Sequence, residues 1–217
     1  MITFYFVRHG ETVWNKAGKF QGRTDIRLSG LGEEQAEKAA EWLKLKKLDG
    51  IVSSPLIRAA RTAEAIAERQ GLAVEYDSNL VELSFGQWEG KTFDEINSQW
   101  PGMMDEMFHN PGNIELPGGE SFKQCQERCM KTIDRLISLG DEKTYAIVSH
   151  GAALRTIICG LIHIPLACSW NLALSNASIT EVQHYPENLN VLNSLNFTAH
   201  LEKKTFDSKE KQPQILR

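Results

Sequence analysis

The chain has 217 residues, of which 41% are hydrophobic and 24% are charged, and its formal net charge is -4 at pH 7. This length and composition are typical of one soluble α/β domain and exclude disordered and fibrous proteins. The negative net charge argues against broad binding to nucleic acid or to an anionic membrane, so a site for an anion must be a local concentration of arginine.

The first residues form a strand-like run, Ile2 to Val7, with no basic leader and no apolar stretch of signal-peptide or membrane-spanning length. We therefore expect a cytoplasmic protein without a membrane partner. The cysteines match no zinc-ligand spacing, and we expect them to be reduced thiols that are mostly buried. They are Cys125, Cys129, Cys159 and Cys168.

Strand-like and helix-like stretches alternate along the chain. The pattern predicts strands at residues 3–8, 50–53, 73–76, 145–149 and 178–184, with a further strand near 191–195. It predicts helices at residues 29–48, from 55 to about 70, and at 92–99, 120–137 and 151–161. Ser54 is the expected N-cap of the second helix, with Pro55 at its first position.

This alternation predicts a single α/β domain with a mostly parallel central sheet and helices on both faces, because parallel neighbours need long right-handed crossovers. We assign the domain to residues 1–201 and the charged, aperiodic residues 202–217 to a C-terminal tail. Residues 100–119 interrupt the alternation and are expected to cover the edge where the strands end. Ligands of such sheets bind beyond the carboxyl ends of the strands.

Three polar clusters directly follow three of the predicted strands. They are Arg8-His9-Gly10-Glu11-Thr12, Ser53-Ser54-Pro55 with Arg58, and Ser149-His150-Gly151. Because the carboxyl ends of parallel strands meet at one edge, we expect two histidines and two arginines to lie close together there. Guanidinium groups and the N–H groups of helix N-termini both bind phosphate well. The clusters therefore predict a phosphate site.

The order and spacing of these clusters and of further motifs resemble the histidine phosphatase superfamily, also called the phosphoglycerate mutase-like family. The resemblance extends over residues 3–201 and implies a phosphoglycerate mutase-like fold. The further motifs are Trp14-Asn15, Gln21-Gly22, Leu28-Ser29 with Gly32, Leu80-Val81-Glu82-Leu83, Phe85-Gly86, Trp88-Glu89-Gly90 and Pro117-Gly118-Gly119-Glu120-Ser121.

The resemblance also implies a role for each motif residue. It makes His9 the nucleophile, Glu82 the proton donor, and Arg8, Arg58 and His150 the phosphate pocket, with Asn15, Gln21, Gly22 and Gly151 completing the binding shell. General chemistry agrees with these roles. A histidine attacks phosphorus only when it is neutral, and neighbouring guanidinium groups lower its pKa toward that state. Arginine stays charged throughout and can hold the equatorial oxygens during transfer.

These roles predict a phosphatase that hydrolyses small phosphate monoesters through a phosphohistidine at His9. Its partner is then a small phosphorylated metabolite and not a nucleic acid. We expect neither a metal nor another cofactor, because the acidic residues near the motifs do not form a ligand set and the arginines already supply positive charge.

Two other functions fit the same motifs. A non-catalytic module would bind phosphorylated ligands, but it needs no paired nucleophile and acid such as His9 and Glu82. A cofactor-dependent phosphoglycerate mutase would return the phosphoryl group to a sugar acid, and the family's mutases supply a lysine and an arginine pair after the acid-bearing segment. Here Lys91 is the only Lys or Arg between Glu82 and Ser121. We expect the apolar and acidic residues 103–108 to line the pocket instead and to hold a carboxylate poorly. Such a wall favours hydrolysis of an ester with an apolar or neutral leaving group.

Overall fold

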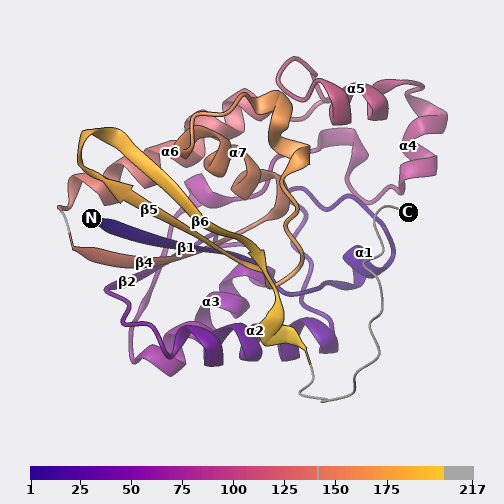
Figure 1. The fold of residues 1–217 in the computed structure, drawn as a ribbon. Coiled ribbons are helices and arrows are strands. Elements are labelled where there is room, and N and C mark those ends of the chain that lie inside the picture. Colours follow the sequence, from indigo (N-terminus) through magenta and orange to yellow (C-terminus); the bar gives the residue numbers. More distant parts are fainter. Residues whose placement is uncertain (141, 203–217) are drawn as a thin grey trace, which may run out of the picture.

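The computed structural model describes residues 1–140 and 142–202, and in them one six-stranded sheet lies between two layers of helices (Figure 1). The strand order is β3-β2-β4-β1-β5-β6. Strands β1 to β4 are parallel, whereas β5 is antiparallel to both of its neighbours. The strands are β1 (Ile2–Arg8), β2 (Gly50–Ser53), β3 (Val74–Tyr76), β4 (Lys143–Ser149), β5 (Ile179–Tyr185) and β6 (Leu189–Phe197). The predicted, mostly parallel α/β architecture is confirmed.

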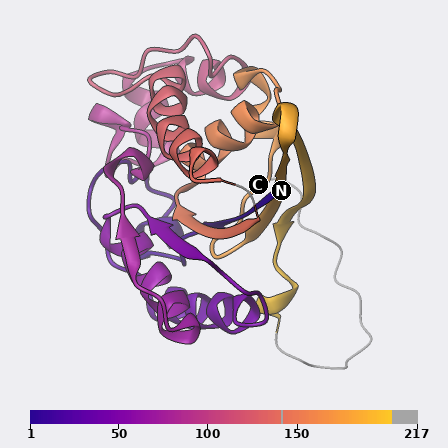
Figure 2. The ribbon, with the colours of Figure 1, turned by 90° about the vertical axis from the view of Figure 1, so that its left-hand side faces the viewer.

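Helices cover both faces of this sheet (Figure 2). One layer contains α2 (Gly30–Leu43) and α3 (Ile57–Gln70), and the other contains α6 (Phe122–Ser138) and α7 (Gly151–Leu161). The shorter α-helices are α1 (Val13–Lys16), α4 (Phe93–Gln99) and α5 (Met103–His109). The 3-10 helices are η1 (Ser78–Leu80), η2 (Gly86–Trp88), η3 (Leu166–Asn171), η4 (Pro186–Asn188) and η5 (Ala199–Leu201).

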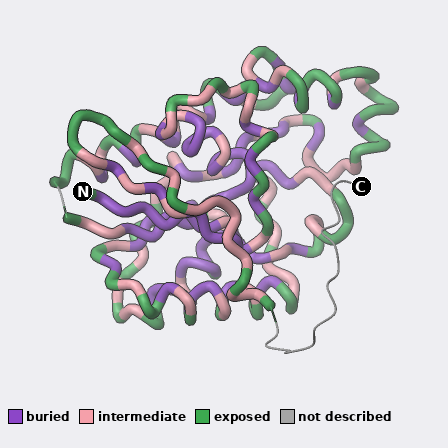
Figure 3. Tube along the Cα trace, viewed as in Figure 1, coloured by how far each residue is buried: buried purple, intermediate pink, exposed green. Residues whose placement is uncertain are grey.

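The side chains of β1 alternate between two hydrophobic cores, one on each face of the sheet. Phe4 and Phe6 belong to the cluster that includes α6 and α7, while Tyr5 and Val7 belong to the cluster that includes α2 and α3. Buried residues are concentrated along the strands (Figure 3). Because a slip of one residue would exchange the two faces, this alternation fixes the register of β1 and the point at which the chain leaves the sheet.

The start of α3 differs from the sequence prediction. The N-cap is Leu56, and α3 begins at Ile57, so Pro55 lies outside the helix. Ser54 is therefore not the cap that we expected. Its hydroxyl oxygen accepts from the N–H of Leu56 at 3.3 Å and also lies 2.7 Å from Nε2 of His150, so a tertiary contact is added to a local one.

The end of α2 also differs, because the helix stops at Leu43 instead of near Leu48. Leu48 is only 6% exposed, and the chain must turn after α2 to bring it into the core before β2 begins. The side chain of Gln70 donates to the carbonyl oxygens of Leu43 at 2.7 Å and of Lys46 at 2.9 Å. These bonds satisfy carbonyl groups that the end of a helix leaves without partners.

The division into a domain at residues 1–201 and a tail at 202–217 stays a prediction. Residues 203–217, which make up nearly all of the predicted tail, lie outside the described part of the chain.

Two glycines bring the loop after β1 into direct contact with the start of α2. A Cβ atom on Gly10 would lie 2.3 Å from the carbonyl oxygen of Gly32, and one on Gly32 would lie 2.0 Å from that of Glu11. Ser29 strengthens the contact, since its N–H donates to the Glu11 carbonyl at 2.8 Å and its hydroxyl donates to Glu11 Oε1 at 2.9 Å. Close contacts between backbone atoms thus fix the position of the loop that begins at His9.

We predict that Gly32→Ala lowers the free energy of unfolding by about 2–3 kcal/mol, because the added methyl group overlaps a backbone oxygen that cannot rotate away. Gly30→Ala is the matched control in the same helix, since a Cβ there meets nothing within 4 Å. This control should be neutral or stabilising by up to about 1 kcal/mol. Urea unfolding of the three proteins measures both effects, and equal midpoints for the two variants would contradict the tight contact.

Candidate active site

The carboxyl ends of three parallel strands meet at one edge of the sheet, because β4 lies between β1 and β2. Arg8 is in register with Ser149 across β1 and β4, and Ser53 is in register with Val148 across β2 and β4. The N–H of His9 donates to the carbonyl oxygen of Ser149 at 3.0 Å. The three polar clusters that follow these strands therefore lie together.

His9 is 2% exposed and neutral in this environment. Burial, followed by the positive charges of Arg58 and Arg8, holds its pKa well below the ordinary value of 6.5. Nδ1 lies 2.6 Å from the carbonyl oxygen of Gly10, so the single proton of the neutral ring is donated from Nδ1. Nε2 consequently carries a lone pair.

One further side chain, Asn176, holds both the backbone of His9 and the amide of Asn15. The side-chain N–H₂ of Asn176 donates to the carbonyl oxygen of His9 at 3.1 Å and to Oδ1 of Asn15 at 3.2 Å. Oδ1 of Asn15 also accepts from the N–H of Thr12 at 3.1 Å. With its oxygen occupied in this way, Asn15 presents its amide nitrogen to the pocket that it lines. The sequence analysis did not identify Asn176.

Arg8 and Arg58 are both held by carbonyl oxygens. Nη1 of Arg8 donates to Leu174 at 2.6 Å, while Nη2 and Nη1 of Arg58 donate to Gly22 at 2.7 Å and to Thr24 at 2.9 Å. The Nε atom of each arginine is buried without a partner in the described residues. Burial lowers the pKa of Arg58 to about 10, which still leaves the group charged at neutral pH.

Hydrogen-bond partners fix the tautomer of His150, which is fully buried. Burial, followed by the charges of Arg58 and of other neighbours, holds its pKa well below 6.5, so the ring carries one proton. The Ser54 oxygen already accepts from the N–H of Leu56 at 3.3 Å, and the acceptor left for its own proton in the described residues is Nε2 of His150 at 2.7 Å. The ring proton then resides on Nδ1, which is buried without a protein partner.

Glu82 lies at the N-terminus of α7 and is 8% exposed. Its Oε1 accepts from the N–H of Ala153 at 2.9 Å and from that of Leu83 at 2.9 Å, and its Oε2 accepts from the N–H of Ala152 at 3.2 Å. Helix N-termini attract carboxylates, and these bonds fix the orientation of the group beside the pocket.

Glu89 fixes the loop that carries Gln21 and Gly22. Its carboxylate accepts from the N–H groups of Arg23 and Thr24, both at 3.0 Å, and from that of Phe85 at 3.2 Å. A Cβ on Gly22 would lie 2.0 Å from Glu89 Oε1, and the φ of +54° at Gly22 also favours glycine. This explains the physical need for glycine at this position.

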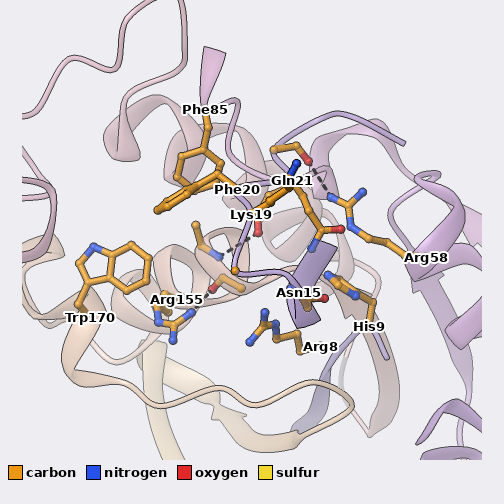
Figure 4. A pocket seen from close by; sticks show the side chains of 15 residues that line it. Arg8, His9, Asn15, Lys19, Phe20, Gln21, Arg58, Phe85, Arg155 and Trp170 are labelled. Carbon is orange, nitrogen blue, oxygen red and sulfur yellow. Dashed lines mark hydrogen bonds between the residues drawn. The ribbon is translucent and has the colours of Figure 1, made fainter. Parts of the chain in front are cut away.

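A cavity of about 220 Å³ opens where these groups meet (Figure 4). Its lining includes eight of the nine site residues that we predicted, namely Arg8, His9, Asn15, Gln21, Gly22, Arg58, Glu82 and Gly151. The ninth residue, His150, lies close behind, with its ring centroid 5.2 Å from that of His9. The sequence analysis missed other lining residues, which include Lys19, Phe20, Phe85, Arg155 and Trp170.

The expectation that residues 103–108 form a wall of the pocket is wrong. Met104 and Met107 of α5 are fully buried in the core, and no residue of this segment lines the cavity. Trp170 forms the wall instead, with the guanidinium carbon of Arg155 4.8 Å from its ring centroid. The pocket is thus richer in cations than the segment after Glu82 implied.

The described residues contain no helix that is long and apolar enough to span a membrane. They also contain no group of three or more His, Cys, Asp or Glu side chains that could hold a metal ion. All four cysteines are free thiols, and three of them are buried, in agreement with the sequence prediction.

The chain matches the family described as histidine phosphatase superfamily (branch 1) over residues 4–198. It belongs to this superfamily. The match confirms the resemblance that the motifs indicated.

Several relatives of this member of the superfamily carry a functional name. This chain is 33% identical to phosphoserine phosphatase 1 of Hydrogenobacter thermophilus over 201 residues, which cover 93% of this chain and 95% of the relative. It is 33% identical to a probable phosphoglycerate mutase, GpmB, of Erwinia tasmaniensis over 184 residues, which cover 85% and 86%. The structure of Entamoeba histolytica phosphoserine phosphatase in complex with 3-phosphoglyceric acid superposes with a TM-score of 0.82 at 35% identity, covering 93% of this chain and 100% of that one.

We predict that Ser54→Ala lowers kcat/KM about tenfold, because loss of the hydroxyl donor lets the His150 proton shift from Nδ1 to Nε2. Ser54→Thr keeps the hydroxyl and should retain most activity. Ser53→Ala is the matched control, since the buried Ser53 hydroxyl donates to a backbone carbonyl oxygen at 2.9 Å. Nitrogen-15 NMR of histidine-labelled protein reports the tautomer directly, and a proton on Nε2 of His150 in the unaltered protein would contradict the assignment.

We also predict that the protein loses stability as the pH falls from about 7.5 to about 5.5. In the unfolded chain His9 takes up a proton near pH 6.5, whereas its lowered pKa keeps it neutral in the folded protein. Its contribution to stability is therefore present above this pH and is lost below it. In His9→Gln, the loss over this range should be smaller by about 1.4 kcal/mol, measured by urea unfolding without phosphate. If His9→Gln lost as much unfolding free energy over this pH range as the unaltered protein, folded His9 would be protonated there.

Proposed function

We propose that this chain is a phosphatase that hydrolyses small phosphate monoesters through a phosphohistidine on His9. The observation that carries the proposal is the state of the His9 ring. It is buried beside two guanidinium groups, its proton is on Nδ1 against the Gly10 carbonyl oxygen, and Nε2 has a lone pair ready for attack.

In the first step of the proposed reaction, Arg8 and Arg58 bind the phosphoryl oxygens while Nδ1–H of His150 donates to one of them. Nε2 of His9 attacks phosphorus, so that the P–N bond forms as the P–O bond to the leaving group breaks. Glu82 acts as the general acid and gives a proton to the leaving oxygen.

In the second step, water attacks the phosphohistidine and the P–N bond breaks. Glu82, now a carboxylate, accepts a proton from this water as the P–O bond forms. Inorganic phosphate leaves, and His9 and Glu82 return to their starting states. The hydrogen bonds at the start of α7 orient the Glu82 carboxylate beside the pocket and support its use as the base of this second step.

The size of the cavity and the relatives support a small substrate. A volume of about 220 Å³ is below the roughly 300–1,000 Å³ of pockets for drug-sized ligands. Relatives of this chain are named for the hydrolysis of phosphoserine and of glucosyl-3-phosphoglycerate. These comparisons support a phosphate ester of a small metabolite as the substrate class.

Phosphoglycerate mutase activity is the second candidate, and two observations favour it. Arg155 and Lys19 line the cavity. The scarcity of Lys and Arg between Glu82 and Ser121 therefore no longer argues against a bound sugar acid. One relative also carries the name of a probable phosphoglycerate mutase. Hydrolysis remains our proposal because the relatives with solved substrate or product-like complexes are named as phosphatases.

We predict that rapid quenching during turnover traps a phosphoryl group that is labile in acid and stable in base, as expected for phosphohistidine. His9→Ala should abolish both this adduct and turnover, whereas the exposed His109 of α5 can be replaced by alanine without loss of either. Near-normal turnover of His9→Ala would contradict the proposed mechanism.

An assay of the unaltered protein distinguishes the two candidate functions. The protein is incubated with 3-phosphoglycerate and a catalytic amount of 2,3-bisphosphoglycerate, and 2-phosphoglycerate and free phosphate are followed together. We expect phosphate release to exceed isomerisation. Isomerisation that far outpaces phosphate release would make the chain a mutase.

A further inference from the structure

Arg155 lies in the pocket without an assigned role. It is on α7, one turn after Gly151, and Figure 4 shows it between Trp170 and Arg8, with Arg58 beyond His9. A Cβ on Gly151 would lie 3.2 Å from Nη1 of Arg155 and 3.5 Å from Nε of Arg8. The two guanidinium groups are therefore neighbours, and Arg155 extends the cationic surface away from the nucleophile.

The hydrogen bonds of Arg155 leave most of its donors available. Nε donates to the carbonyl oxygen of Leu172 at 2.9 Å, and Nη1 donates to that of Gly151 at 3.0 Å. A guanidinium group has five N–H donors, so the other three have no partner in the described residues. The Trp170 ring covers one face of the group, 4.8 Å from its central carbon. The group is thus held in one orientation with part of its edge unoccupied.

No carboxylate within ion-pair distance neutralises Arg155 among the described residues. In this respect Arg155 resembles Arg8 and Arg58 of the same pocket, whereas five other arginines form such pairs. They are Arg23, Arg61, Arg69, Arg128 and Arg135. Burial, followed by repulsion from Arg8, lowers the pKa of Arg155 to about 10, and the group remains charged at neutral pH. A half-buried charge without an ion-pair partner favours the binding of an anion.

The phosphoryl group does not account for this charge. A phosphate dianion balances Arg8 and Arg58, which lie on either side of His9. The Glu82 carboxylate also attracts Arg155, but its oxygens accept from backbone N–H groups and no ion pair joins the two side chains in the described residues, so the remaining donors of Arg155 still lack a partner. We propose that Arg155 binds a carboxylate on the leaving group, so that the enzyme prefers phosphate monoesters that carry a carboxylate close to the phosphate. The inference rests on the proposed phosphatase function and assigns the part of the substrate that this function leaves open.

A carboxylate fits Arg155 better than a second phosphate group does. The planar edge of a guanidinium group matches the two oxygens of a carboxylate in a bidentate pair. The single charge of Arg155 balances the single charge of a carboxylate, whereas a phosphate dianion would require another cation. Lys19, the remaining lining cation, is partly exposed, and its ammonium group lies 5.9 Å from the ring centroid of Trp14.

The test compares two substrates that differ in this one group, O-phosphoserine and O-phosphoethanolamine. We expect the unaltered enzyme to prefer phosphoserine by about tenfold to 100-fold in kcat/KM, as for a charged hydrogen-bonded pair. Arg155→Gln should remove most of this preference, chiefly through KM for phosphoserine, because the carboxylate takes no part in the bond changes. Arg155→Lys should recover part of it. Arg61→Gln, a change at an exposed ion pair, is the control and should leave the preference intact.

Equal losses on both substrates in Arg155→Gln would overturn the proposal and would assign Arg155 to the phosphoryl group or to the fold. A second measurement separates this outcome from a failure of the proposed function. Calorimetric binding of both esters to His9→Ala, with and without Arg155→Gln, needs no turnover. Tighter binding of phosphoserine that depends on Arg155 supports the carboxylate site even in a chain that hydrolyses neither ester. Equal binding of the two esters contradicts it.

Discussion

Positive charge without local neutralisation is the constraint on which the rest of the site depends. Arg8, Arg58 and Arg155 are held by backbone carbonyl oxygens, so their positions are fixed while their charges stay available to a ligand. Carboxylates in the same places would have cancelled the field that binds phosphate. The nearby carboxylates of Glu82 and Glu89 are bound by backbone N–H groups instead. Backbone dipoles thus keep opposite charges apart within one small volume.

Much of the fold and the site could be predicted because their signals are local or periodic. Strands with alternating or continuous apolar residues end at Arg8, Ser53 and Ser149. The rule that ligands bind at the ends of parallel strands brings those positions together. The order of the motifs then led to the correct superfamily. The roles assigned to His9 and Glu82 remain predictions, although the geometry supports them.

What the sequence did not reveal depends on tertiary contacts. Ser54 before Pro55 is a good local cap signal, yet its hydroxyl lies close enough to His150 to donate to the ring. Arg155 could have been found, since it follows Gly151 by four residues and so lies on the same face of α7. Trp170 offers no such signal, because η3 is irregular and only its packing shows that the indole lies against Arg155. The apolar residues of α5 suggested a pocket wall, but Met104 and Met107 serve the core.

The carbonyl-held arginines repel one another, and an anion that binds between them reduces this repulsion. Since the unfolded chain has no such cluster, an oxyanion that binds here shifts the folding equilibrium by mass action, by about 2.7 kcal/mol at 100 times its dissociation constant. Inorganic phosphate, the product of the proposed reaction, is one such solute. A buffer anion that binds in the pocket therefore raises the thermal stability of the protein and at the same time lowers its apparent affinity for substrate.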